Sequence, residues 1–381
     1  MVTPENHAVS FVLYHYFPHG GLQQDFLKTA LACQRLGYAV SVYTTRWEGQ
    51  RPEGFVIHQM PVNGSTNHRR MVNFQQAILA EKKAGDLLLI GFNKMAGLDI
   101  YFASDTCYRK KGLTERSWLY RLTPRYKIFE QLERAVFGHE SSSHALVLTQ
   151  RQVMDFQTHY QTPEERFTLL PPGIARNDYI DKRQSTRDSI RKSLSLSDSD
   201  IMLLLVGSRF KTKGLDRAIS ALAALPEVLQ KKTSLVVAGG DKPDGYQRQA
   251  EKSGIANQVV FLGARDNVQQ LMVAADVLVH PARTESAGMV LVEAIAAGLP
   301  VIVTDNCGYA HHVERADAGI VVPAGPYQQK QLNTAVQMMV GSGSLDYWQQ
   351  QGLRYAAEMD LYSLHEQAAQ IIDQHFKQRY S

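Results

Sequence analysis

Short apolar runs alternate with amphipathic stretches along the chain, and this alternation is typical of parallel α/β folds. In the first half, segment 23–36 has apolar residues at helical spacing and ends at Gly37. Four apolar or β-branched runs predict strands, at 9–15, 40–44, 87–92 and 145–149. We therefore predict a sheet of parallel strands covered by helices in this half.

The second half repeats the alternation after Pro171-Pro172-Gly173, which stops any regular element. Its predicted strands are 201–207, 234–238, 259–262, 276–280 and 301–304, and its predicted helices are 216–229, 267–275, 328–340, 345–359 and 364–376. The predicted fold class is α/β, with two Rossmann-like doubly wound domains facing a central cleft. We predict domains at 1–172 and 173–360, followed by a final helix within 361–381.

Composition is that of an ordinary soluble enzyme. The 381 residues are 44% hydrophobic and 20% charged, with a formal net charge of +4. Cys33, Cys107 and Cys307 are widely spaced and form no CxxC pair, so they predict neither a disulfide framework nor a zinc site. No apolar run reaches the length of a membrane span, and the run from Val9 is too short for a signal sequence. We expect a cytoplasmic protein.

Two glutamates eight residues apart, Glu285 and Glu293, are the most informative feature. They follow the strand predicted at 276–280, whose carboxyl end is where α/β sheets bind ligands. A helix predicted from Ser286 would separate the carboxylates by roughly 10 Å. The free N–H groups of its first turn suit a diphosphate, and they belong to Ala287, Gly288, Met289 and Val290. Each carboxylate would then bind hydroxyls at one end of a nucleotide-sugar; the alternative is two solvated glutamates on a surface helix.

Two turns at strand ends carry further candidates. Gly20 and Gly21 follow the first strand, but the GxGxxG dinucleotide fingerprint is missing, which disfavours a dehydrogenase. Strand 201–207 leads into a basic turn without a Walker A pattern, and cations there suit a diphosphate. Its candidate residues are Ser208, Arg209, Lys211 and Lys213. Simple turn geometry and a solvated basic turn are the alternatives.

Four aspartates complete the candidates. Asp25 and Asp105 lie near loops of the first half, where a carboxylate can bind an acceptor hydroxyl or take its proton; a structural cap is the alternative. Asp198 and Asp200 have the DxD spacing of a metal–diphosphate clamp, but they precede a strand, so we interpret them as part of a solvated turn. No His, Cys or Asp cluster has the spacing of a metal site, and no metal is predicted.

Segment 108–134 concentrates positive charge, with eight basic residues against three glutamates and with aromatic residues between them. This combination suits an anionic membrane surface, at about 1 kcal/mol per Lys or Arg near it. The predicted contacts are Arg109, Lys110, Lys111, Arg116, Trp118, Arg121, Arg125 and Lys127. A solvated helical face with buried aromatics is the alternative, and nucleic acid is not predicted as a partner.

Four strings of the sequence, together with the Glu-x7-Glu motif, point to one family. They are YHYFPHGGLQQDF at 14–26, GFNKMAGLDIYFASDTCY at 91–108, HYQTPEERF at 159–167 and DLYSL at 360–364. With them the chain resembles the GT-B glycosyltransferases of family 4, and more narrowly their lipopolysaccharide core glucosyltransferase I type. The resemblance covers nearly the whole chain. Glu-x7-Glu marks only the large family, whereas the first-domain strings are much more specific.

The resemblance implies retaining transfer of glucose from UDP-glucose to heptose I of the lipopolysaccharide inner core. It implies a peripheral position on the cytoplasmic face of the inner membrane, no cofactor besides the donor substrate, and a C-terminal helix that crosses back onto the first domain. Glu285 would contact the donor sugar, Glu293 the ribose and Lys213 the diphosphate. The backbone of 287–290, with Gly20, Gly21, Ser208 and Arg209, would complete the donor site. Asp25 and Asp105 would line the acceptor side, with Asp105 also catalytic.

The chain departs from this family at two positions. Ser208 stands where many members have Arg, and Thr212 stands where the subgroup often has a basic residue. Arg209 or Lys211 would then supply the missing charge.

Two other functions fit the same fold. One is a family-4 transferase that uses another UDP-sugar or another acceptor, because hexose choice depends on one or two hydroxyl contacts. The other is a non-catalytic protein that binds a membrane surface. Intact Glu285, Glu293 and Lys213 argue against the second.

Overall fold

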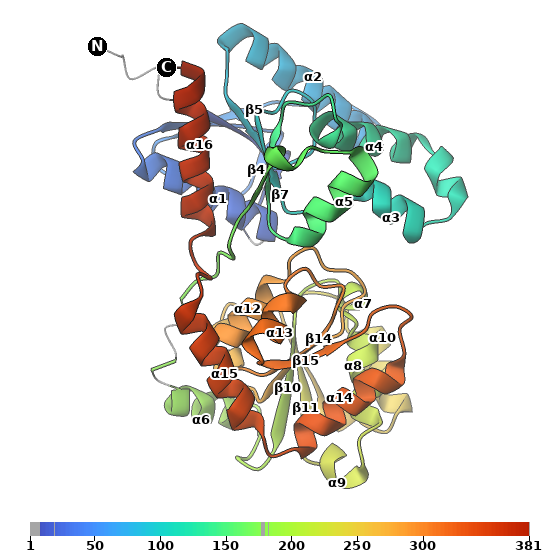
Figure 1. Ribbon diagram of the computed structural model, residues 1–381. Coiled ribbons are helices and arrows are strands. Elements are labelled where there is room, and N and C mark those ends of the chain that lie inside the picture. Colours follow the sequence, from blue (N-terminus) through green and yellow to red (C-terminus); the bar gives the residue numbers. More distant parts are fainter. Residues whose placement is uncertain (1–7, 19, 177–179, 182, 381) are drawn as a thin grey trace. The chain divides into compact units, whose positions relative to one another are not determined.

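The computed structural model describes residues 8–18, 20–176, 180–181 and 183–380. The chain divides into two compact units: Met1–Pro171 together with Ser363–Ser381, and Pro172–Tyr362. Each unit is built on one main parallel sheet with helices packed on it (Figure 1). The predicted α/β class is therefore confirmed.

The first unit is built on seven parallel strands in the order β5-β3-β1-β6-β7-β8-β9. Their bounds are β1 Ala8–Val12, β3 Ala39–Thr44, β5 Phe55–Gln59, β6 Leu89–Gly91, β7 Ile100–Ala103, β8 His144–Val147 and β9 Phe167–Leu169, and a short separate pair is formed by β2 His15–Tyr16 and β4 Arg46–Trp47. The helices and 3-10 turns are α1 Gly21–Arg35, α2 Asn67–Gly85, α3 Tyr108–Thr114, η2 Trp118–Leu122, α4 Pro124–Phe137, α5 Gln150–Tyr160 and η3 Glu164–Arg166. The sequence pattern missed β7, because four apolar residues do not show whether a buried segment is strand or helix.

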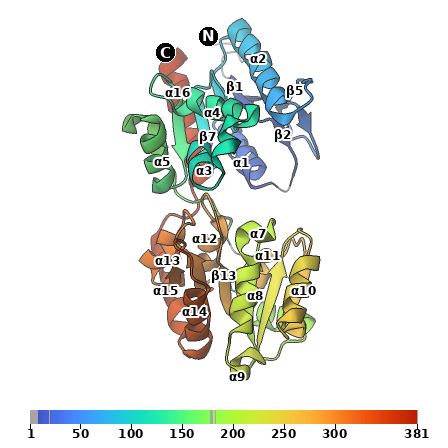
Figure 2. The same cartoon turned by 90° about the vertical axis from the view of Figure 1, so that its right-hand side faces the viewer.

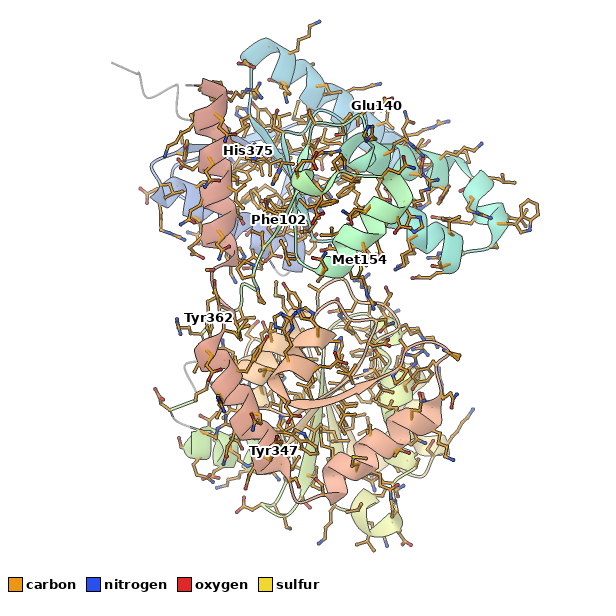
Figure 3. All side chains as sticks on the ribbon, in the orientation of Figure 1. Phe102, Glu140, Met154, Tyr347, Tyr362 and His375 are labelled. Carbon is orange, nitrogen blue, oxygen red and sulfur yellow. The ribbon has the colours of Figure 1, made fainter. Side chains whose placement is uncertain are left out.

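The last helix, α16 (Leu364–Tyr380), belongs to the first unit and lies beside α1 (Figure 1). The Tyr38 hydroxyl donates to Asp373 at 2.7 Å, and the rings of Tyr38 and Phe376 are 4.9 Å apart. On the side facing the sheet, the His375 ring lies 4.9 Å from the ring of His144 (Figure 3). Polar and aromatic contacts together therefore hold this helix on the first unit.

The second unit is built on six parallel strands in the order β12-β11-β10-β13-β14-β15. Their bounds are β10 Ile201–Val206, β11 Thr233–Ala238, β12 Val259–Gly263, β13 Val277–His280, β14 Val301–Thr304 and β15 Gly319–Val322. From β10 the chain builds one side of the sheet through β11 and β12, and then returns to build the other side from β13. Since β10 and β13 are neighbours, the strand order reverses between them, and such a switch point is where open α/β sheets bind ligands.

Helices cover both faces of this sheet. Their bounds are α6 Arg183–Ser193, α7 Phe210–Lys213, α8 Leu215–Ala223, α9 Glu227–Gln230, α10 Asp244–Lys252, α11 Val268–Ala274, α12 Met289–Ala296, α13 Ala310–Ala316, α14 Gln329–Gly341 and α15 Leu345–Glu358, with a 3-10 turn η4 at Ala256–Gln258. α8 packs with α10 and α14, while α12 packs with α13 and α15 (Figure 2). The helix predicted at 216–229 is two helices, because Pro226 cannot continue α8.

One buried carboxylate organises the start of the basic segment in the first unit. Glu133 is 0% exposed, and Lys94 binds it at 2.6 Å. The backbone N–H groups of Tyr108 and Arg109 donate to it at 2.8 and 2.9 Å, and the Tyr160 hydroxyl donates at 2.7 Å. Burial raises the pKa of Glu133, but the Lys94 charge and these hydrogen bonds outweigh burial and lower it. Glu133 therefore anchors the N-terminus of α3, just after the loop of Asp105.

Replacing Glu133 with Gln should lower the free energy of unfolding of the first unit by about 3–5 kcal/mol. The reason is that Lys94, only 13% exposed, loses its buried counter-charge. Hydrogen exchange of the β7 and β8 amides measures this locally. As a control, Glu366→Gln removes the exposed pair with Arg35 and should change stability by less than about 1 kcal/mol. Equal effects of the two variants would contradict the role of Glu133.

Candidate active site

Glu285 lies in the loop that follows β13 at the switch point of the second sheet. All four residues of β13 are buried, as predicted for this strand. The Glu285 side chain is 17% exposed, and its backbone forms a single parallel bridge with Cys307, beyond the end of β14. The carboxylate is therefore held at the carboxyl edge of the sheet by backbone pairing on one side.

The helix after Glu285 starts later than predicted. α12 begins at Met289 rather than Ser286, because its N-cap Gly288 has φ 91° and the preceding residues form the bridge to Cys307. A Cβ at Gly288 would lie 3.2 Å from the Glu285 side chain, so both the backbone conformation and the close approach favour glycine. The separation of roughly 10 Å that we predicted for the two carboxylates assumed a continuous helix from Ser286, and it therefore does not apply.

Glu293 is the fifth residue of α12 and is half-buried. The Ala287 carbonyl accepts a hydrogen bond from the Tyr309 N–H at 2.7 Å, which fixes the segment before the helix. The first N–H groups of α12, at Met289 and Val290, have no partner within the helix by helix geometry and suit an anion.

Lys213 is the residue that the structure brings to Glu285. It ends the short helix α7, and its ammonium binds Glu285 Oε2 directly, with only 16% of the Lys213 side chain exposed. The N-cap of α7 is Arg209, which has a left-handed backbone, and the Phe210 N–H donates to Asp241 at 2.8 Å. The loops after β10 and β13 thus place two predicted site residues in contact across the switch point.

His280 completes this cluster, and sequence analysis missed it. It is 0% exposed, and its Nε2 lies 3.4 Å from Glu285 Oε2, but neither ring nitrogen has a hydrogen-bond partner among the described residues. Burial lowers the pKa of His280, and the contact with Glu285 only partly offsets this. A histidine at the end of an otherwise apolar strand was the available signal.

The electrostatics keep Glu285 ionised. Burial raises the pKa of this carboxyl, but the His280 contact and the Lys213 charge outweigh burial and hold it at about 2. Since Lys213 is in direct contact and His280 is 3.4 Å away, we attribute most of the stabilisation to Lys213. Glu285 is therefore a carboxylate acceptor of hydrogen bonds at any physiological pH.

The other predicted donor-site residues of this unit take different places. The side chains of Ser208 and Arg209 are exposed at the turn after β10. Lys211 is also exposed and lies 3.4 Å from Asp216. A pocket of about 610 Å³ lies beside this turn, and its lining includes Lys211, Asp216, Arg217, Tyr246, Arg283 and Tyr327. Neither Lys213 nor Glu285 lines that pocket, so we build the site on their contact.

In the first unit, the predicted residues follow different strands of the sheet. Gly20 is the N-cap of α1, and Gly21 is its first residue. Asp25, within α1, binds His365 of α16 at 3.1 Å, so its carboxylate has a structural partner. Asp105 is exposed in the loop between β7 and α3. Buried Gln152 fixes that loop by donating to the Ala103 and Asp105 carbonyls.

The basic segment presents apolar side chains as well as cations. η2 exposes Trp118, Leu119 and Leu122 by 63%, 56% and 58%. Arg116 and Arg125 are exposed and lie over the Tyr120 and Phe129 rings. Lys127 is also exposed, and Arg121 is half-buried.

The first three predicted membrane contacts are instead paired within the unit. Lys110 binds Asp155 at 2.7 Å, Lys111 lies 3.7 Å from Glu115, and Arg109 lies 3.7 Å from Glu130.

Asp200, outside this segment, accepts hydrogen bonds from the Ser197 N–H and hydroxyl, as expected of a turn rather than a metal clamp.

A family model and a solved structure indicate the class of protein. Residues 186–349 match the family model described as glycosyl transferases group 1. At 16% identity, HepE of Anabaena in complex with UDP and glucose shares the fold, with a TM-score of 0.72 over 98% of this chain and all of that chain. This part of the chain therefore matches the group 1 glycosyltransferases, and the whole chain has the GT-B fold.

The family within that class follows from nearer relatives. The lipopolysaccharide glucosyltransferase WaaG of Escherichia coli is 46% identical over 369 residues, which are 96% of this chain and 98% of that protein. The crystal structure of WaaG, a glycosyltransferase involved in lipopolysaccharide biosynthesis, matches with a TM-score of 0.89 and 45% identity over 96% of this chain and 99% of that chain. The chain belongs to the WaaG family, and the resemblance noted from the sequence is confirmed.

Replacing Lys213 with Gln should destabilise the second unit by about 2 kcal/mol at pH 7, because Glu285 loses a charged hydrogen-bond donor. The Glu285 pKa is lowered from 4.5 to about 2, so the stabilisation by the pair is complete above pH 4.5 and is lost as the pH falls toward 2. The difference between wild type and variant should therefore shrink at pH 3. Hydrogen exchange of the β10 and β13 amides at both pH values measures it.

The matched control is Lys231→Gln, which removes an exposed pair with Glu227 in the same unit. Its effect should stay within about 0.5 kcal/mol at either pH. A Lys213→Gln effect that does not depend on pH would contradict the assignment of the charge pair.

Proposed function

We propose that this protein transfers glucose from UDP-glucose to heptose I of the lipopolysaccharide inner core, with retention at the anomeric carbon. The observation that carries the proposal is the contact between Glu285 and Lys213 at the switch point of the second sheet. The 46% identity to a lipopolysaccharide glucosyltransferase supports glucose as the transferred sugar and lipopolysaccharide as the acceptor.

A UDP-sugar offers each member of the pair a new partner. Its diphosphate matches the Lys213 ammonium, and its sugar hydroxyls match the Glu285 carboxylate. The N–H groups at the start of α12 add donors for phosphate oxygens, and Glu293 binds the ribose. The positive charge for the diphosphate thus comes from Lys213 and backbone dipoles, and we propose that no metal ion takes part.

We further propose a reaction on one face of the sugar. The bond between the anomeric carbon and the β-phosphate oxygen breaks, and the acceptor hydroxyl oxygen bonds to that carbon on the same face. The acceptor proton passes to the leaving phosphate, and UDP is released. Lys213 stabilises the charge that develops on the phosphate, which is where a fixed cation lowers the barrier most. On the acceptor side, Asp105 and Asp25 are the proposed contacts for the heptose.

Replacing Glu285 with Ala should reduce kcat/KM for UDP-glucose by about a thousandfold or more, because contacts that strengthen in the transition state are lost. Release of UDP in the presence of lipopolysaccharide truncated after the inner-core heptoses measures the reaction. Glu314→Ala, at an exposed carboxylate on α13, is the control and should keep full activity. An undiminished rate for Glu285→Ala would refute its role.

The same assay distinguishes the alternatives when it is run with a panel of donors. If UDP is released faster from UDP-galactose or UDP-N-acetylglucosamine, the transferred sugar is galactose or N-acetylglucosamine rather than glucose. Absence of donor-dependent release with every sugar would favour a non-catalytic, membrane-binding protein of the same fold.

We also propose that the protein binds the cytoplasmic face of the inner membrane through η2 and its flanking cations. Exposed Trp118, Leu119 and Leu122 supply apolar area, and exposed Arg116 and Arg125 supply charge for anionic headgroups. No helix of the described residues has the length and apolar character needed to cross a bilayer. The surface mode of attachment fits an acceptor that is itself a membrane lipid.

Reversing two exposed cations, Arg116→Glu with Arg125→Glu, should weaken binding to vesicles with anionic lipid by about tenfold or more, since each cation contributes about 1 kcal/mol. Flotation of the protein with such vesicles measures this. The control is Arg69→Glu with Lys83→Glu, which reverses two exposed cations on α2 of the same unit and should have a smaller effect. Equal losses for both pairs would indicate general charge attraction rather than a defined surface.

A further inference from the structure

Arg283 joins the two loops that carry Glu285 and Lys213. Its guanidinium makes a two-pronged bond with Asp216, at 2.8 and 2.7 Å. The same group donates to the Lys211 carbonyl at 2.8 Å, and the Arg283 backbone N–H donates to the Thr212 carbonyl at 2.8 Å. One residue, two positions before Glu285, thus binds the α7 turn immediately before Lys213 and also the first turn of α8.

The rest of this loop is held in the same way. Arg217 donates to the Pro281 carbonyl at 3.1 Å, Thr304 donates to the Ala282 carbonyl at 2.8 Å, and Asn306 donates to the Arg283 carbonyl at 2.5 Å. Three consecutive backbone carbonyls before Glu285 are therefore fixed by side chains from α8, from the last residue of β14 and from the loop after β14.

The two loops also touch through their backbones. Gly214, between α7 and α8, has φ 76°, and a Cβ there would lie 2.1 Å from the Pro281 carbonyl oxygen. Only glycine permits this approach. The contact places the end of α7 against the start of the Glu285 loop independently of the Arg283 side chain.

The charged side chains of the Asp216–Arg283 ion pair are partly exposed to solvent. The side chains of Arg283 and Asp216 are 30% and 26% exposed, and the 610 Å³ pocket opens beside them. The Asp216 hydrogen bond raises the pKa of Arg283, and the pKa of Asp216 is lowered by Arg283 despite the opposing effect of burial. Ion pairs at such partly exposed sites contribute little to global stability, so the geometry of the loops is the better explanation of the network.

We propose that the Asp216–Arg283 pair positions the donor-binding loops, by holding Lys213 and Glu285 at the separation that a sugar diphosphate requires. This inference rests on the proposed function. Among the described residues, no hydrogen bond or ion pair joins Asp216 or Arg283 to the side chains of Glu285 and Lys213, so both are positioning residues rather than catalytic ones. Small displacements of reacting groups are costly, since about 1 Å can reduce a rate about a hundredfold.

The experiment compares Arg283→Lys, Asp216→Asn and the double variant in the UDP-release assay. Lys keeps the charge but cannot bind both Asp216 oxygens and the Lys211 carbonyl together. Each single variant should lower kcat/KM for UDP-glucose about tenfold to a hundredfold, with a raised KM for the donor and an unchanged KM for truncated lipopolysaccharide. The double variant should be no worse than the poorer single variant, because both changes break one bridge.

The control is Arg354→Lys, which alters an exposed pair with Glu358 on α15 and should leave all parameters unchanged. The proposal is overturned if the variants keep wild-type donor parameters, if the KM values for donor and acceptor rise together, or if the two losses are additive. Thermal unfolding of each variant measures how much folded protein is lost. If activity falls only in proportion to the folded protein, the positioning proposal is also overturned.

The outcome for wild type separates this inference from the proposed function. If wild type transfers glucose from UDP-glucose, the variants then test only the positioning role of the Asp216–Arg283 pair. If wild type transfers no glucose, the proposed function fails, and calorimetric binding of UDP then tests the bridge directly. Weaker UDP binding by both single variants would support the bridge, and equal binding by wild type and variants would overturn it.

Discussion

The contact between Glu285 and Lys213 joins the two loops that follow β10 and β13, and the candidate site of the second unit depends on it. A carboxylate that is only 17% exposed has lost most of its hydration, and this loss is tolerable only beside a cation. Lys213 supplies the cation, and neutral His280 lines the buried side. The two loops meet because β10 and β13 are neighbours at the point where the strand order reverses, so their carboxyl ends open at the same place.

The first unit uses a buried carboxylate for a different purpose. Glu133 is saturated by Lys94, Tyr160 and two backbone N–H groups, so no acceptor capacity is directed toward a ligand. It instead anchors α3 after the Asp105 loop. The contrast with Glu285 is physical: one carboxylate is enclosed within a core, whereas the other remains 17% exposed beside the Lys213 ammonium.

Most strands could be predicted from the sequence, because fully buried parallel strands are continuous apolar runs, and the loops carrying Lys213 and Glu285 could be predicted from the strands they follow. The start of α12 could not, because a left-handed Gly288 and a bridge to Cys307 override the helical pattern. Composition correctly singled out the segment around Trp118 as basic and aromatic. It could not show that Lys110 is paired with Asp155, which lies 45 residues away.

The sequence by itself determined the α/β class, the family, and the two residues whose chemistry suits a sugar and a diphosphate. These depend on local patterns, namely apolar periodicity, glycine placement and the spacing between neighbours in the chain. Only the tertiary structure decided that Glu285 and Lys213 touch, that His280 borders them, and that Arg283 binds both loops. The Glu285–Lys213 and Arg283–Lys211 contacts each join residues 72 positions apart, and they arise from strand order and backbone approach, which no local pattern encodes.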